Sequence, residues 1–168
     1  APLLVHARGI VLEADSHFVG DKLVIAASAS VALDADVIDA LDSGIPLHFV
    51  LEAKIARSHR YWVEETLSGT HRDFVVERHA LADRYSLLET STNRVQTFRT
   101  IDEVLGALGD LPEVLSAPRD TLAPGASYIA KVRLRLNTDE LPAPMRPTVW
   151  ISPAWWVSSG WHEWTIKP

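Results

Sequence analysis

The sequence predicts a mainly β protein, an antiparallel β-sandwich with two short helices, formed by residues 1–168 as a single domain. Segments in which apolar and polar residues alternate recur along the chain, as in strands with one face in a core. Gly, Asn and Asp mark turns between them, as expected for antiparallel neighbours. Only two short segments show helical periodicity, too few for the crossover helices of a parallel sheet.

The first half of the chain contains most of the predicted strands. Residues 9–18 and 22–33 form a hairpin around Gly20 and Asp21, and residues 45–58 form a long alternating strand. Strand structure then continues over residues 61–67, a turn is expected at residues 69–71, and residues 72–83 form a further strand. Residues 85–89 and 94–99 flank a polar tip and predict another hairpin.

The predicted helices cover residues 36–43 and 101–108. Asp34 or Asp36 caps the first, and Thr100 with Glu103 forms a capping box before the second. Residues 127–136 form a strong strand, and residues 149–151 and 155–166 complete the chain as strand pieces. Three prolines between these regions argue against a regular helix there. The whole arrangement is immunoglobulin-like in general architecture.

Composition excludes several functional classes. The net charge of −6 argues against a nucleic-acid partner, and the chain has no cysteine for disulfides, thiolate metal sites or thiol nucleophiles. Lys131, Arg133 and Arg135 alternate with apolar residues, so we interpret them as the solvated face of a strand. No apolar run reaches the length of a membrane-spanning helix.

No catalytic residue, cofactor site or metal site is predicted. The seven histidines show no metal-ligand spacing, and the segment Ser158-Ser159-Gly160 is not a nucleophile elbow. Glu64 and Glu65 are adjacent, so on a strand their carboxylates point to opposite faces. We therefore expect a protein that is not an enzyme.

Five tryptophans gather near the C-terminus and raise the main functional question. On a strand, Trp155 and Trp156 face opposite ways, and so do Trp161 and Trp164; Trp150 lies just upstream. One interpretation is that this segment is clamped between layers, with one tryptophan of each pair almost fully buried. The alternative is a patch that contacts a partner or ligand, since aromatic residues are enriched at interfaces.

Several blocks resemble one known family. Residues 41–52, LDSGIPLHFVLE, resemble the opening of a proteobacterial family called domain of unknown function 4390. Its later blocks are resembled, in order, by residues 60–62, 84–85, 96–98, 122–125, 141–147, 152–155 and 158–161. The resemblance covers nearly the whole chain and implies no activity or catalytic residue.

The resemblance also implies a location and a kind of partner. Members of the family usually carry an N-terminal signal, and Ala1 is a normal first residue after signal cleavage, so we expect an exported, periplasmic protein. The family's genes often lie near a membrane sensor kinase. The resulting hypothesis is a non-enzymatic accessory or interaction module at the bacterial envelope. The alternative is a carrier of a small apolar or sugar ligand, bound between the sheets or beside the tryptophans.

Overall fold

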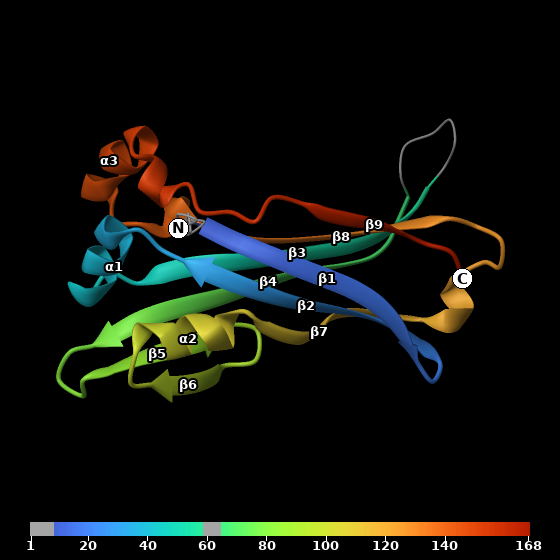
Figure 1. Cartoon of the computed structure of the whole chain (residues 1–168), viewed down its shortest axis with the longest axis horizontal. Coiled ribbons are helices and arrows are strands. Elements are labelled where there is room, and N and C mark those ends of the chain that lie inside the picture. The colour runs from blue at the N-terminus through green and yellow to red at the C-terminus, as the bar shows by residue number, and fades with distance from the viewer. Residues whose placement is uncertain (1–8, 59–64) are drawn as a thin grey trace, which may run out of the picture.

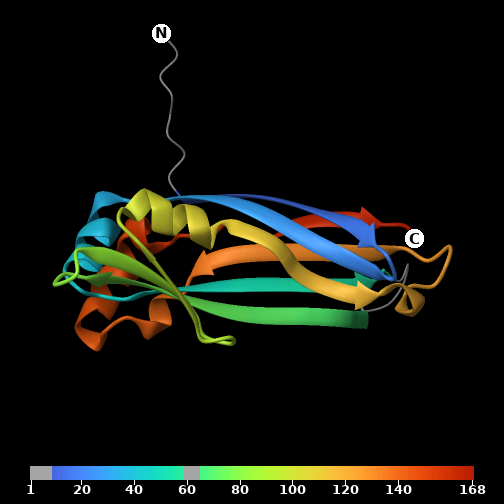
Figure 2. The same cartoon turned by 90° about the horizontal axis from the view of Figure 1, so that it is seen from below.

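The computed structural model describes residues 9–58 and 65–168, which form two antiparallel sheets packed face to face (Figures 1 and 2). The smaller sheet has the order β1-β2-β7, and the larger has the order β6-β5-β4-β3-β8-β9. The predicted antiparallel β-sandwich is confirmed. The strands are β1 (Gly9–Val19), β2 (Lys22–Ala32), β3 (Leu47–Arg57), β4 (Glu65–His79), β5 (Arg84–Glu89), β6 (Arg94–Phe98), β7 (Asp110–Pro118), β8 (Tyr128–Leu136) and β9 (His162–Ile166).

The centre of the larger sheet follows the predicted alternation. Every second residue of β3, from Leu47 to Ile55, is at most 3% exposed and faces the smaller sheet. Strand β8 pairs with β3 through Ala53 opposite Val132, and its own alternate residues are buried in the same way. The inner faces of β1 and β2 complete this core, so apolar side chains fill the space between the sheets.

Both predicted helices are present. Helix α1 (Ala35–Asp42) begins one residue before its predicted start, and helix α2 covers Ile101–Leu108 as predicted. The capping box is also confirmed, because Glu103 donates its backbone N–H to Oγ1 of Thr100 at 3.2 Å. The Glu103 carboxylate accepts from the backbone N–H of Arg99 at 3.0 Å, one residue before the expected donor.

Gly109 allows the end of α2 to approach the smaller sheet. Its carbonyl accepts a hydrogen bond from the N–H of Ala29 at 2.9 Å. A Cβ atom at position 109 would lie 1.9 Å from the carbonyl oxygen of Ala29, which is far inside van der Waals contact. The backbone φ of −84° suits any residue, so the close approach is what requires glycine here.

The predictions for residues 69–71 and 149–151 were wrong. Residues 69–71 form no turn but lie inside β4, where Gly69 pairs with Lys54 and His71 with Glu52. Residues 149–151 belong to helix α3 (Arg146–Ile151), not to a strand. Pro147 lies in the first turn of α3, where a missing N–H costs no hydrogen bond, so this proline helps the helix to begin.

The chain between β8 and β9 is built from short helical turns. Besides α3, these are the 3₁₀ helices η2 (Thr138–Glu140), η3 (Ala143–Met145) and η4 (Pro153–Trp155). Trp155 therefore lies on η4 and not on the strand predicted for residues 155–166. Helices α1 and α3 lie at the same end of the sandwich (Figure 1). The predicted block at residues 60–62 and most of the strand at 61–67 lie outside the described residues.

Candidate functional site

The five tryptophans do not form one patch. Trp155 is 3% exposed and belongs to the core, and Trp164 is partly buried against it. Trp150, Trp156 and Trp161 are exposed by 73%, 62% and 42%. The prediction that one of Trp155 and Trp156 is nearly fully buried is confirmed. The same prediction for Trp161 and Trp164 is wrong, because Trp164 lies at a partly open edge of the sandwich.

The buried and partly buried tryptophans fasten the C-terminal segment to the fold. Trp155 lies in the same apolar core as Leu141, Val149 and Val157, which come from the turns around it. Trp164 lies on β9, and its indole N–H donates to the hydroxyl of Ser16 on β1 at 3.0 Å. This hydrogen bond joins the edge strands of the two sheets. These two residues therefore have a structural role.

Trp150, Ile151 and Trp156 form an exposed apolar surface that we call the α3 surface. Ile151 is 81% exposed and follows Trp150 at the end of the helix. The indole N–H of Trp156 donates to the carbonyl of Val149 at 2.9 Å, which holds this ring beside the last turn of α3. Large apolar side chains exposed around one end of a helix mark an interaction surface more often than isolated ones do.

A hollow with a polar rim adjoins the α3 surface. It has a volume of about 260 Å³ and is lined by Thr138, Asp139, Arg146, Val149 and Trp150. Arg146 donates from Nη2 to the carbonyl of Asp139 at 3.2 Å, which connects α3 to η2. The surface thus combines exposed apolar groups with a neighbouring polar border.

The outer face of the larger sheet carries a ladder of charged residues. Glu52 on β3 accepts from Nε of Arg133 at 2.7 Å and lies 3.5 Å from Nε of Arg135. Burial alone would raise the pKa of Glu52, but its hydrogen bonds and charge interactions with the two arginines outweigh burial and lower it. Lys131 pairs with Glu163 at 3.1 Å. The basic strip is therefore the solvated face of β8, as predicted.

Trp161 lies beside this ladder. Its ring packs against the guanidinium of Arg133, with the Cζ atom 4.4 Å from the ring centroid. Next to it, the outer face of the sheet is hollowed by about 420 Å³, with Glu52, Ala53, Lys54, Thr66, Gly69, Thr70, His71 and Trp161 around the hollow. Sequence reasoning misses this site because it predicts a turn at residues 69–71. Their place on β4 brings them opposite residues 52–54.

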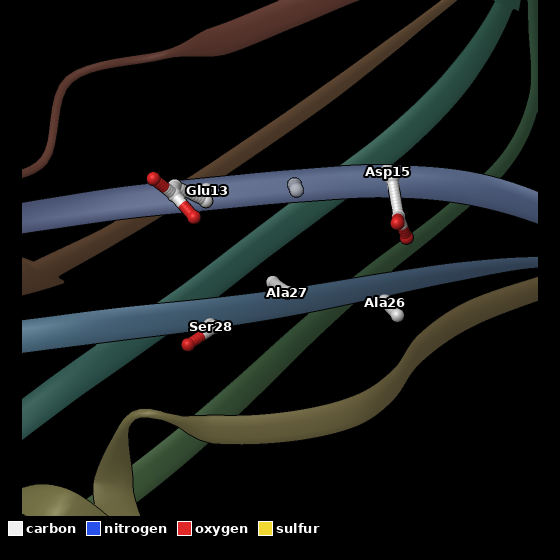
Figure 3. Close-up of a pocket in the computed structure, with 6 residues that line it drawn as sticks. Glu13, Asp15, Ala26, Ala27 and Ser28 are labelled. Atoms are coloured by element: carbon white, nitrogen blue, oxygen red, sulfur yellow. The ribbon is translucent and has the colours of Figure 1, made fainter.

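Another hollow, of about 380 Å³, lies on the smaller sheet (Figure 3). Glu13 and Asp15 project from β1, and Ala26 and Ser28 come from β2. Strand β7 bulges away from β2 here, because Ile25 pairs with Leu115 but Ala27 pairs with Leu111. Across the described residues, no group of three or more His, Cys, Asp or Glu side chains is placed to hold a metal ion.

A serine and a histidine are close together but lack the arrangement of a catalytic relay. His79 Nε2 lies 2.8 Å from the hydroxyl of Ser86 and 3.9 Å from the carboxylate of Glu77. Ser86 and Glu77 both approach Nε2 of His79, whereas in a catalytic triad the carboxylate contacts the ring nitrogen that does not face the serine. Ser86 is also only 5% exposed.

Comparison with known families identifies the chain. The family model named Domain of unknown function (DUF4390) matches residues 10–165. The chain belongs to this family. The DUF4390 match includes both sheets, all three α-helices and the five C-terminal tryptophans. No curated protein and no solved structure matches the chain significantly. In the described part of this DUF4390 structure, no helix is long and apolar enough to cross a membrane.

Proposed function

We propose that this chain is an exported, periplasmic, non-enzymatic interaction module of the bacterial envelope, and that it docks onto a protein partner through the α3 surface. The observation that carries this proposal is the exposure of Trp150, Ile151 and Trp156 by 73%, 81% and 62%. Tryptophan is the residue type most enriched among those that dominate binding energy at protein interfaces.

The α3 surface is also preorganised. Trp156 is held by its hydrogen bond to Val149, and both Val149 and the neighbouring Trp155 are buried in the core. The exposed rings are therefore attached to a fixed part of the fold, which lowers the entropy lost on binding. The polar hollow beside Trp150 supplies a border of the kind that surrounds the apolar centre of an interface.

The location and the kind of partner rest on the family resemblance and on composition. The family's members usually carry an export signal, and a chain without cysteine has no thiol to oxidise in the periplasm. The family's genes often lie near a membrane sensor kinase, so we propose an envelope or membrane sensor protein as the partner.

The experiment is a capture from membrane extract followed by a direct titration. The wild-type chain is used to isolate a partner, which is identified and purified. Its affinity is then measured for the wild type and for a Trp150→Ser/Ile151→Ser double variant. A matched control replaces two exposed valines elsewhere, Val11→Ser/Val95→Ser, which are 55% and 58% exposed in the wild type.

We expect the Trp150→Ser/Ile151→Ser variant to bind the partner at least about tenfold more weakly, with the control unchanged. All three proteins should have similar melting temperatures, because the replaced side chains are exposed. Equal affinity of the wild type and the α3-surface variant would overturn the proposal.

A further inference from the structure

The hollow on the outer face of the larger sheet is separate from the α3 surface and has the features of a ligand site. It lies across β3 and β4 and reaches Trp161, which precedes β9. Its volume of about 420 Å³ falls within the range of small-molecule sites, toward the lower end. We call it the Trp161 hollow.

Trp161 forms a fixed aromatic wall of this hollow. His162 pairs with Val132, so the preceding residue lies beside Arg133, whose guanidinium packs against the indole ring. The turn before Trp161 is held by the Ser159 hydroxyl, which accepts from the N–H of Leu134 at 3.0 Å. The ring remains 42% exposed and lines the hollow. A flat apolar surface is therefore available to a ligand.

Gly69 lines the same hollow from β4. Glycine weakens a strand, and within a strand it often marks a place where a ligand or another backbone comes close. The local geometry does not require glycine at this position. A Cβ would meet its nearest atom, the carbonyl oxygen of Ala53, at an ordinary 3.5 Å, and the φ of Gly69 is not positive. The missing side chain instead leaves the strand backbone open to the hollow.

The rim of the hollow combines hydrogen-bond donors and acceptors and has charges of both signs, since Lys54 lines it together with Glu52. Glu52 supplies carboxylate oxygens whose charge is balanced by Arg133 and Arg135. His71 lies 3.3 Å from Asp73, and Thr66 also lines the hollow. A purely apolar ligand would cut these polar groups off from water without replacing the hydrogen bonds that water makes, and a strongly anionic ligand would meet the Glu52 carboxylate.

We propose that the Trp161 hollow binds a neutral saccharide. One sugar ring would place its apolar C–H face on the exposed indole of Trp161, and its hydroxyls would bond to the polar groups of the rim. Neighbouring hydroxyls of the sugar would donate to the Glu52 carboxylate, while the Thr66 hydroxyl can both donate and accept. A shallow site with one aromatic wall binds weakly, with a Kd on the order of millimolar for a single ring.

The test uses the full chain and four neutral trisaccharides: maltotriose, cellotriose, mannotriose and triacetylchitotriose. Binding is followed by changes in NMR shift, with the indole N–H of Trp161 and the amide of Gly69 as reporters. Inorganic phosphate serves as an anionic comparison. We expect at least one sugar to shift both reporters saturably, and phosphate to leave them unchanged.

Two variants locate the site. Trp161→Ala should weaken the binding of that sugar at least about tenfold. Gly69→Val should abolish binding by occupying part of the hollow, yet keep the fold, because valine favours strands and a Cβ meets only ordinary contacts here. Trp150→Ala should bind the sugar as the wild type does. Failure of all four sugars, a response to phosphate alone, or unchanged sugar binding by folded Gly69→Val would each overturn the proposal.

The two proposals fail independently. The Trp150→Ser/Ile151→Ser variant should lose the protein partner and keep the sugar. Gly69→Val should lose the sugar and keep the partner. A negative result for one surface therefore does not count against the proposal for the other.

Discussion

The indole N–H of Trp164 donates to the hydroxyl of Ser16 at 3.0 Å, although the two residues are 148 positions apart in sequence. Trp164 lies on β9 at the edge of the larger sheet, and Ser16 lies on β1 at the edge of the smaller one. The other side of the sandwich has a matching connection, because Arg72 on β4 donates to the carbonyl of Glu113 on β7 at 3.1 Å. The two sheets are thus joined at both sides.

The Trp164–Ser16 hydrogen bond should contribute measurably to stability. We expect Trp164→Phe and Ser16→Ala each to lower the free energy of unfolding by about 1 kcal/mol, the net value of a neutral hydrogen bond. The double variant should lose little more than either single one, because both remove the same interaction. Urea denaturation of the four proteins checks this. Fully additive losses would show that the two residues act separately.

Replacing Trp150, Trp155 or Trp156 by alanine should lower the free energy of unfolding by very different amounts. Trp155→Ala removes a side chain that is 3% exposed, so it should cost about 3–5 kcal/mol through the cavity that it leaves. Trp150→Ala should cost less than about 0.5 kcal/mol, because Trp150 is 73% exposed. Trp156→Ala also loses a hydrogen bond and should cost about 1 kcal/mol. Thermal melts of the three variants measure this order, and equal losses would contradict it.

Local patterns in the sequence are sufficient to predict much of the fold. The alternation in residues 45–58 predicts β3 and its buried face, and the capping box at Thr100 predicts α2 with its observed ends. These signals work because they depend on neighbours within a few positions. Helix α3 escapes prediction because prolines inside a helix break it, whereas Pro147 lies at the start, where proline is tolerated.

The candidate sites depend on contacts between distant segments and could not be predicted in the same way. The Trp161 hollow requires the register that places Glu52 opposite both His71 and Arg133. Alternation along a single strand does not specify which residues of its neighbours lie opposite. Strand alternation predicted correctly that only one of Trp155 and Trp156 is buried. The cause is different, however, because Trp155 lies in a 3₁₀ turn and not on a strand.

Two glycines around α2 should respond to alanine in opposite directions. Gly109→Ala places a Cβ 1.9 Å from the carbonyl oxygen of Ala29, so we expect a loss of at least about 1–3 kcal/mol. Gly106 lies within α2, and a Cβ at this position would meet no neighbouring atom within 4 Å. Gly106→Ala should therefore gain about 0.5–1 kcal/mol from helix propensity. Urea denaturation measures both. A gain for Gly109→Ala would show that α2 can move away from β2.

The ion pairs of Glu52 should make stability depend on pH in the acid range. Its pKa is lowered in the folded protein by Arg133 and Arg135, against the effect of burial, so the unfolded chain binds a proton more readily. The stabilisation is therefore present above the ordinary pKa of about 4.5 and is lost as the pH falls through the lower, folded value. Glu52→Gln has no such titration. The difference between the two proteins should be about 1 kcal/mol at neutral pH, since the pairs are partly exposed.

Urea denaturation of the wild type and Glu52→Gln between pH 7 and pH 2 measures this difference. We expect it to be constant down to about pH 5 and then to shrink toward the acid end of the range. Glu140→Gln, which removes an exposed carboxylate on η2, controls for the general effect of one charge. A Glu52→Gln difference that is independent of pH, or that grows as the pH falls, would show that the two arginines do not stabilise the ionised carboxylate.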